Sequence, residues 1–148
     1  MQISEILTQD CVLVKVECRS KKDALDTLAK IIANSDNSTS QTEVYDCLLA
    51  RERLGSTGLG NGIAIPHGRL PQSKKTIGAF IQLPEAIDYD ANDKLPVDLL
   101  FALIVPEEST DEHLQILSKL AEKFSDHNIL QQLRKETDSE KLYSILSS

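Results

Sequence analysis

The sequence predicts an α/β (α+β sandwich) fold in which a mixed central β-sheet is flanked by helices. Strand-like and helix-like segments follow one another along the 148 residues, and one long apolar run suits a strand covered on both faces. The composition, 41% hydrophobic and 26% charged, is typical of a soluble globular protein. The length favours one domain over residues 1–148, with a sizeable core.

The first part of the chain predicts one strand and two helices. The alternation of apolar and polar residues over Cys11–Val16 predicts a strand. Ser20 stands where a capping residue precedes an amphipathic helix. After a polar connection, Thr42 is expected to cap a second helix, which ends near Gly55 because glycine tolerates the left-handed geometry of a C-terminal cap.

The second part of the chain predicts three strands followed by three helices. The strands are short apolar runs bounded by Pro or Gly, at Ile63–Ile65, Thr76–Leu83 and Val97–Val105. The last of these is apolar enough to be a central strand. Ser109 and Glu112 have the spacing of a capping box that opens a long helix, and two more helices are expected over 126–136 and 138–146.

Charge and composition exclude several classes of function. A net charge of -7 argues against binding to nucleic acid or to an anionic membrane surface. The residues after Met1 lack a secretory signal, and the longest apolar stretch, Leu99–Val105, is too short for membrane insertion, so we expect a cytoplasmic protein. The cysteines, Cys11, Cys18 and Cys47, have neither the number nor the spacing of a disulfide framework or a zinc site.

A glycine-rich segment that ends in a histidine is the strongest candidate for a functional site. It presents His67 at the end of a short apolar run, where an imidazole suits proton transfer, metal binding or covalent attack. Its backbone N–H groups suit a phosphoryl group, and the alternative is a flexible loop with a surface histidine. Nucleotide-loop spacing is absent from it. The candidate phosphate-loop residues are Ser56, Thr57, Gly58, Gly60, Asn61, Gly62 and Gly68.

Two further residues are candidates because of their helical spacing. His113 shares a predicted helix face with apolar residues, so it is either a core histidine or a partner of His67 that contacts a phosphoryl oxygen. Arg51 lies on the inward stripe of the helix that precedes the glycine segment, where it either binds phosphate or complements the helix C-terminus. Arg53 and Arg69 are weaker candidates. His127 fits no constellation.

These residues carry a resemblance to a known family. Residues 51–68, RERLGSTGLGNGIAIPHG, resemble the active-site signature of mannitol- and fructose-type IIA domains of the phosphotransferase system. The resemblance is strongest to the nitrogen-regulatory branch, because the signature is combined with Pro96–Leu103 and with His113 followed by Leu114. It covers nearly the whole chain and implies a single type-2 IIA domain with the mannitol-type IIA fold.

The resemblance also implies a function and a set of partners. His67 is then the residue that receives a phosphoryl group, on Nε2, from a small histidine phosphocarrier protein, while His113 and Arg51 assist. No metal, nucleotide or other cofactor is implied. Regulated partners in such a family include sensor kinases and potassium transport systems. Two alternatives stay open: a sugar-transport IIA subunit that passes phosphate to a IIB domain, and a binding module in which His67 is never modified. A hydrolase that uses His67 as a base has less support.

Overall fold

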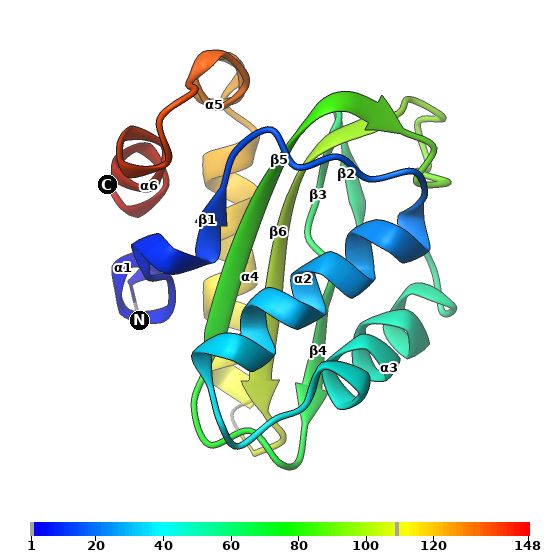
Figure 1. Ribbon diagram of the computed structural model, residues 1–148, viewed down its shortest axis with the longest axis vertical. Helices are drawn as coiled ribbons and strands as arrows, with labels where there is room; N and C mark the ends of the chain where they lie inside the picture. Colours follow the sequence, from blue (N-terminus) through cyan, green and yellow to red (C-terminus); the bar gives the residue numbers. More distant parts are fainter. Residues whose placement is uncertain (1, 109) are drawn as a thin grey trace.

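A mixed six-stranded β-sheet forms the centre of the computed structural model, which describes residues 2–108 and 110–148 (Figure 1). The strands are β1 (Val12–Leu13), β2 (Gly58–Gly60), β3 (Ile63–Ala64), β4 (His67–Leu70), β5 (Ile77–Ile87) and β6 (Val97–Pro106). They lie in the order β1-β5-β6-β3-β2, and β4 pairs with β6 farther along than β3 does. β5 runs antiparallel to β6, whereas β3 and β4 run parallel to it. The predicted mixed sheet is therefore confirmed.

Helices cover both faces of the sheet. They are α1 (Ile3–Ile6), α2 (Lys21–Ser35), α3 (Gln41–Glu52), α4 (Thr110–Phe124), α5 (His127–Lys135) and α6 (Ser139–Ser147), with a 3-10 turn at Gln9–Cys11. α2 and α3 lie side by side on one face, with α2 against β5 and α3 against β4, and α4 lies on the opposite face (Figure 1). α1 and α6 pack together beside β1, near both chain termini (Figure 1).

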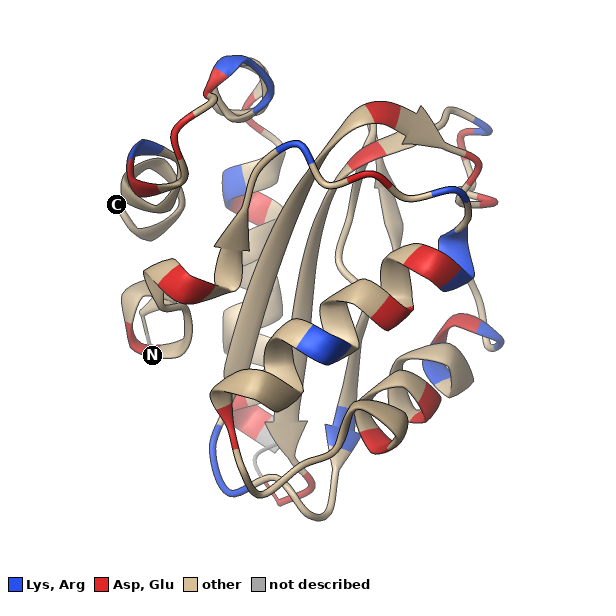
Figure 2. Cartoon of the chain, viewed as in Figure 1, with Lys and Arg blue, Asp and Glu red and all other residues tan. Residues whose placement is uncertain are grey.

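The central strand β6 explains the long apolar run in the sequence. Every residue of Leu99–Val105 is buried, because helices cover the strand on both faces. The Phe101 ring lies 6.3 Å from the ring of Phe80 on β5 and 6.1 Å from that of Phe124 on α4. Figure 2 shows the charged residues on the helices, loops and strand ends, away from the middle of β5 and β6. The predicted central strand is confirmed, and its packing fixes α4 against the sheet.

Side-chain caps mark the starts of several helices, and the predicted cap at Ser20 is confirmed. The Ser20 hydroxyl accepts a hydrogen bond from the Asp23 backbone N–H at 3.1 Å, at the start of α2. Asp126 and Asp138 cap the two predicted C-terminal helices in the same way. The prediction at Ser109 lies outside the described residues.

The cap of α3 differs from the prediction. Ser40, and not Thr42, caps this helix: its hydroxyl accepts from the Glu43 backbone N–H at 3.1 Å, and the Glu43 carboxylate accepts from the Ser40 N–H at 3.1 Å. This reciprocal pair is the Ser-x-x-Glu capping box, and it stabilises an earlier helix start than a lone threonine cap. The helix ends at Glu52, a few residues before Gly55.

Three short elements and several strand boundaries also differ from the prediction, among them that of β5, which is predicted to end at Leu83 and ends at Ile87. The strand predicted over Cys11–Val16 is reduced to Val12–Leu13, because Lys15 adopts a positive φ of 52° that turns the chain out of the ladder. The short elements α1, β2 and β4 carry too few residues to show a period in the sequence. Within the part of the chain that the structure describes, no helix has the length and apolar character needed to cross a membrane.

Candidate active site

His67 is the first residue of β4, at the point where the chain leaves β3. Pro66 lies between the two strands, and its carbonyl accepts a hydrogen bond from the Leu103 N–H at 2.9 Å. β4 then continues alongside β6, with His67 in register with Leu103. The histidine is therefore half-buried and held by a backbone that is paired immediately before and after it.

The tautomer of His67 follows from one hydrogen bond. Its Nδ1 lies 2.7 Å from the carbonyl oxygen of Ile65, and because a carbonyl can only accept, Nδ1 carries the proton. Burial lowers the pKa of His67, and the Arg51 charge acts in the same direction, while the Ile65 carbonyl and the Glu52 carboxylate oppose them. At neutral pH the ring is therefore neutral, with the free lone pair on Nε2.

His113 meets His67 from the other side of the fold. It lies on α4, it is 6% exposed, and its ring centroid is 5.3 Å from that of His67 with an interplanar angle of 72°. Burial, together with the charges of His67, Arg69 and Arg51, lowers the pKa of His113 to about 4, so its ring is neutral at pH 7. Its Nδ1 has no hydrogen-bond partner among residues 2–108 and 110–148. A core histidine would normally be satisfied, so the unpartnered Nδ1 makes His113 unusual for a residue of the core.

Arg51 completes the group of residues around His67. It lies in the last turn of α3, and its Nη1 donates to the Gly55 carbonyl at 3.0 Å. It lines the same pocket as His67 and His113, and its charge lowers the pKa of both rings. The hydrogen bond to Gly55 holds a guanidinium beside the imidazoles, which suits the binding of an anionic group.

An open pocket of about 810 Å³ exposes this group to solvent. Its lining includes His67, His113 and Arg51, together with Arg69 and the exposed side chain of Leu54. Two guanidinium groups and two neutral imidazoles thus line one cavity, and the carboxylates of Glu43 and Asp46 also belong to its lining. That combination suits a small dianion such as a phosphoryl group.

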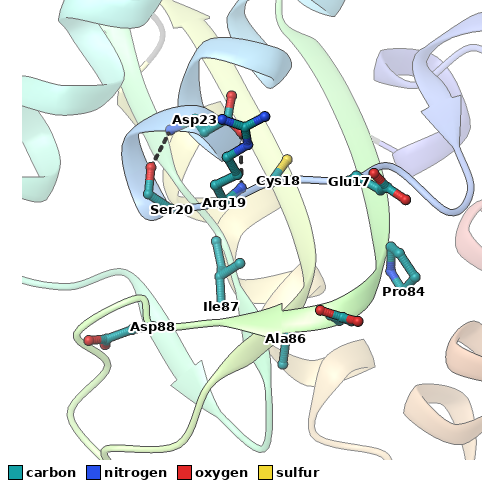
Figure 3. A pocket seen from close by; sticks show the side chains of 10 residues that line it. Glu17, Cys18, Arg19, Ser20, Asp23, Pro84, Ala86, Ile87 and Asp88 are labelled. Atoms are coloured by element: carbon teal, nitrogen blue, oxygen red, sulfur yellow. Dashed lines mark hydrogen bonds between the residues drawn. The ribbon is translucent and has the colours of Figure 1, made fainter.

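A larger cavity, of about 990 Å³, lies elsewhere and has a different character. Figure 3 shows it between the start of α2 and the end of β5. Its polar groups are bonded to one another: Asp23 N–H donates to the Ser20 hydroxyl, and Arg19 N–H donates to the Asp23 carboxylate at 3.0 Å (Figure 3). These are the contacts of a helix cap, and the other ionisable side chains of the lining are Glu17, Cys18, Glu85 and Asp88, so no histidine lies there.

The structure does not bring Gly60, Asn61 and Gly62 next to His67. All three have positive φ, at 95°, 59° and 83°, and they form the turn between β2 and β3. The Gly62 carbonyl accepts from the N–H of Asp98, whereas His67 is in register with Leu103. Five residues along a strand correspond to roughly 16 Å. Asn-Gly is the preferred pair for such a hairpin turn, so backbone geometry accounts for these residues.

The remaining residues of the predicted phosphate loop lie nearer to His67 but are engaged inside the protein. Thr57 is buried, and its N–H donates to the Glu52 carboxylate at 3.2 Å. The Gly58 N–H donates to the hydroxyl of Ser56 at 3.1 Å. At Gly68, an added Cβ would lie 2.5 Å from the Cys47 sulfur, so this glycine lets α3 pack closely against β4.

Two residues near the site were not among the leading sequence candidates. Arg69 lines the pocket two residues after His67, and strand alternation would have placed both side chains on one face had β4 been recognised. Glu52 is 6% exposed, beside Arg51 at the end of α3. A glutamate after an arginine at the end of a helix is an ordinary surface pattern, so no signal in the sequence indicated its burial.

Comparison with known proteins gives one consistent result. Residues 5–148 match the family model described as "Phosphoenolpyruvate-dependent sugar phosphotransferase system, EIIA 2". The chain is 44% identical to a protein named "Nitrogen regulatory protein" from Klebsiella oxytoca over 148 residues, which cover 99% of this chain and 91% of that one. A protein of the same name from Escherichia coli (strain K12) is 43% identical over 148 residues, which cover 99% and 90%.

Solved structures agree with the sequence comparison. The crystal structure of nitrogen regulatory protein IIA-Ntr from Neisseria meningitidis superposes with a TM-score of 0.92 at 45% identity, covering 97% of this chain and 98% of that chain. The crystal structure of IIA mannitol from Escherichia coli has a TM-score of 0.80 at 21% identity, covering 94% and 97%. The second match shows the shared fold alone.

Proposed function

This chain belongs to the phosphoenolpyruvate-dependent sugar phosphotransferase system EIIA 2 family, and we propose that it accepts a phosphoryl group on His67 from a small histidine phosphocarrier protein. Nitrogen regulatory proteins are its relatives at 37–44% identity over nearly the whole chain, which supports a regulatory role. The observation that carries the proposal is the hydrogen bond from His67 Nδ1 to the Ile65 carbonyl, because it leaves Nε2 as the nucleophile in a pocket that Arg51 and Arg69 also line.

The chemistry is an in-line exchange of one nitrogen–phosphorus bond for another. The Nε2 lone pair of His67 attacks the phosphorus of the donor phosphohistidine, and a new bond forms between Nε2 and phosphorus. The donor nitrogen–phosphorus bond breaks, and its electron pair returns to the donor imidazole. The proton on His67 Nδ1 stays in place, where the Ile65 carbonyl stabilises the positive charge that develops on the ring.

The surrounding residues supply positioning and charge stabilisation, which are the main requirements of phosphoryl transfer. Arg51 neutralises charge on the equatorial oxygens, and its bond to Gly55 keeps the guanidinium oriented. His113 is neutral and close to His67, so it can donate one N–H to a phosphoryl oxygen. Arg69 adds a second cation at the mouth of the pocket.

The phosphorylation state changes the surface that a partner meets. A phosphoryl group brings nearly two negative charges into a pocket whose free form has two guanidinium groups, at Arg51 and Arg69. The proposed classes of regulated partner are sensor kinases and potassium transport systems. Such a partner then discriminates the phosphorylated from the unphosphorylated protein by charge. Calorimetric titration of such a partner against the phosphorylated protein and against His67→Ala should give different affinities, and equal affinities would contradict regulation by charge.

The transfer step has a direct test. Incubation with phosphoenolpyruvate, the general phosphotransferase enzyme and a small phosphocarrier should add the mass of one phosphoryl group, measured on the intact protein without acid. His67→Ala should add nothing, while His127→Ala, which removes an exposed histidine on α5, should behave as the wild type. Normal phosphorylation of His67→Ala would refute the proposal. An unmodified wild type would favour the binding module.

A sugar-transport role is the second candidate, because a protein named "PTS system fructose-specific EIIA component" from Haloferax volcanii is 30% identical over 145 residues. In that case the phosphoryl group on His67 would pass to a sugar-specific IIB domain and then to sugar. Incubation of the phosphorylated protein with fructose- and mannitol-type IIB domains should leave it phosphorylated if its role is regulatory. Rapid loss to one of them would favour transport.

A further inference from the structure

A buried charge lies behind the proposed phosphoryl acceptor. The Glu52 carboxylate is almost fully enclosed, with its side chain 2% exposed, and it accepts hydrogen bonds from Lys21 Nζ at 2.9 Å and Thr57 N–H at 3.2 Å. The Thr57 hydroxyl donates to its second oxygen. A buried carboxylate is costly unless several donors satisfy it, so this arrangement requires an explanation.

Thr57 and Tyr89 both take part in this network. A carboxylate only accepts, so the single hydroxyl proton of Thr57 points to Glu52. The Tyr89 hydroxyl lies 3.2 Å from the Thr57 oxygen, within hydrogen-bond distance. Burial, and next the Glu52 charge, raises the pKa of Tyr89, so its hydroxyl keeps its proton. Lys21 also lies 4.5 Å above the centre of the Tyr89 ring. Thr57 is thus held through both its N–H and its hydroxyl.

The network continues to the reacting ring. The Thr57 carbonyl accepts from the Ile65 N–H at 3.1 Å, and the Ile65 carbonyl accepts from His67 Nδ1 at 2.7 Å. One residue, Ile65, therefore joins Thr57 to His67 through two successive peptide groups, because its N–H belongs to the peptide with Ala64 and its carbonyl to the peptide with Pro66. The position of the Ile65 carbonyl decides which ring nitrogen carries the proton, and Glu52 anchors Thr57, which holds the N–H of the same residue in place.

We propose that Glu52 is a positioning residue which acts through Thr57 and Ile65 to keep His67 in the Nδ1–H tautomer, with Nε2 free to accept a phosphoryl group. The inference rests on the proposed function for its biological meaning, but the tautomer can be measured without any transfer. A role confined to folding would not require the hydrogen bonds to end on the ring of His67. The Glu52 charge also acts on that ring directly, opposing the drop in the pKa of His67.

The tautomer is measured by nitrogen NMR on protein labelled at histidine, since the chain has only three histidines to assign. In the wild type, His67 should show a protonated Nδ1 and an unprotonated Nε2 above pH 8. Thr57→Val, which removes the hydroxyl but keeps the side-chain shape, should lower the ratio of Nδ1–H to Nε2–H by at least about fivefold. Thr57→Ser, which keeps the hydroxyl, should show the wild-type ratio. Glu52→Gln should act like Thr57→Val.

A matched control separates positioning from general destabilisation. Thr39→Val removes another buried hydroxyl, one that donates to the Asp36 carbonyl at 3.2 Å between α2 and α3. It should leave the ring nitrogens of His67 unchanged. Unchanged His67 shifts in Thr57→Val, or an equal change in Thr39→Val, would overturn the proposal. If Glu52→Gln fails to fold, Thr57→Val and Thr57→Ser still decide it.

Transfer kinetics connect the tautomer to function. With a phosphocarrier as donor, Thr57→Val should reduce the maximal rate of phosphorylation of His67 by roughly tenfold to hundredfold, with little change in the concentration for half-maximal rate. Thr57→Ser should recover most of the rate. A rate unchanged in Thr57→Val would contradict the positioning role. A wild type that accepts no phosphoryl group would instead refute the proposed function, while the NMR result would still decide the network.

Discussion

The two ends of the segment 60–69 differ in how their polar groups are used. At the turn, the Asn61 N–H donates to the Asp93 carboxylate, and Arg134 of α5 bonds both to Asp98 and to the Asn61 carbonyl. At the other end, His67 and His113 line an open pocket, and the buried Nδ1 of His113 has no hydrogen-bond partner among the described residues. The polar groups of the first end are satisfied by the protein itself, whereas one buried polar atom of the second end is not.

The difference shows that the residues of one glycine-rich motif have separate roles. Conformational need explains Asn61 and Gly62, whose positive φ makes a tight turn possible. Close packing explains Gly68, because a side chain there would separate α3 from β4. Only the His67 end combines a nucleophile, cations and an unsatisfied polar atom, which together mark a site of chemistry. Substitutions at the two ends should therefore have separate effects.

The largest effect should come from Arg51→Ala. Loss of the guanidinium removes charge stabilisation of the phosphoryl group in transfer, which should slow the phosphorylation of His67 by roughly a hundredfold. The free energy of unfolding should change by less than about 0.5 kcal/mol. Rapid-quench kinetics with a phosphocarrier measures the rate. Arg53→Ala, an exposed arginine at the end of the same helix, is the matched control and should transfer normally.

The second largest effect should be a loss of stability in acid, through His113 at the pocket end. The pKa of His113 is lowered to about 4 in the folded protein, whereas it is about 6.5 in the unfolded chain, so the unfolded state binds more protons between these values. Stability present above pH 6.5 is therefore lost as pH falls towards 4. Between pH 7.5 and pH 5.0 the wild type should lose about 2 kcal/mol more than His113→Gln does.

Urea unfolding at the two pH values measures this difference. His127→Gln is the control, because His127 is exposed at the start of α5, and it should retain the pH dependence of the wild type. If wild type and His113→Gln lose the same stability on acidification, the neutral buried state of His113 is refuted.

Arg134→Ala should affect the turn end by a smaller amount. It leaves the Asp98 carboxylate and the Asn61 carbonyl without the guanidinium, at a site that is partly open to solvent, so the loss should be about 1 kcal/mol. Phosphorylation of His67 should stay within about twofold of the wild type, because the turn lies roughly 16 Å away along the sheet. Lys135→Ala is the control for stability. A transfer defect in Arg134→Ala comparable with that of Arg51→Ala would remove the distinction between the two ends.

The smallest effect should come from a single exposed side chain at the pocket. Leu54 is 84% exposed and lines the pocket, so Leu54→Ser should raise the KM for the phosphocarrier roughly threefold to tenfold, through lost apolar contact, without changing stability. Leu59→Ser alters a 45% exposed leucine on β2 and should leave KM unchanged. Equal KM values for the two variants would show that Leu54 does not contact the phosphocarrier.

The elements with strong patterns were predictable from the sequence, and the short ones were not. Leu99–Val105 is apolar at every position, as expected of a strand covered on both faces, and Ser20 marks its helix start by local hydrogen bonding. By contrast, the strand that carries His67 has only four residues, too few to show a period in the sequence. Its pairing with β6 is what defines it as a strand. The Ser-x-x-Glu spacing of Ser40 and Glu43 is a local signal for the start of α3, and it outweighs the lone Thr42.

The sequence by itself determined which residues could do chemistry. The signals were local: the motif around His67, the inward position of Arg51, and a histidine on an apolar helix face. Local patterns of this kind can be read directly from the sequence. The tertiary structure decided which of them meet. It places the ring centroid of His113 5.3 Å from that of His67, and the Asn61 turn at the other end of the sheet. It also buries Glu52 against Lys21 and Thr57. Burial and proximity depend on contacts between distant segments, so no local pattern contains them.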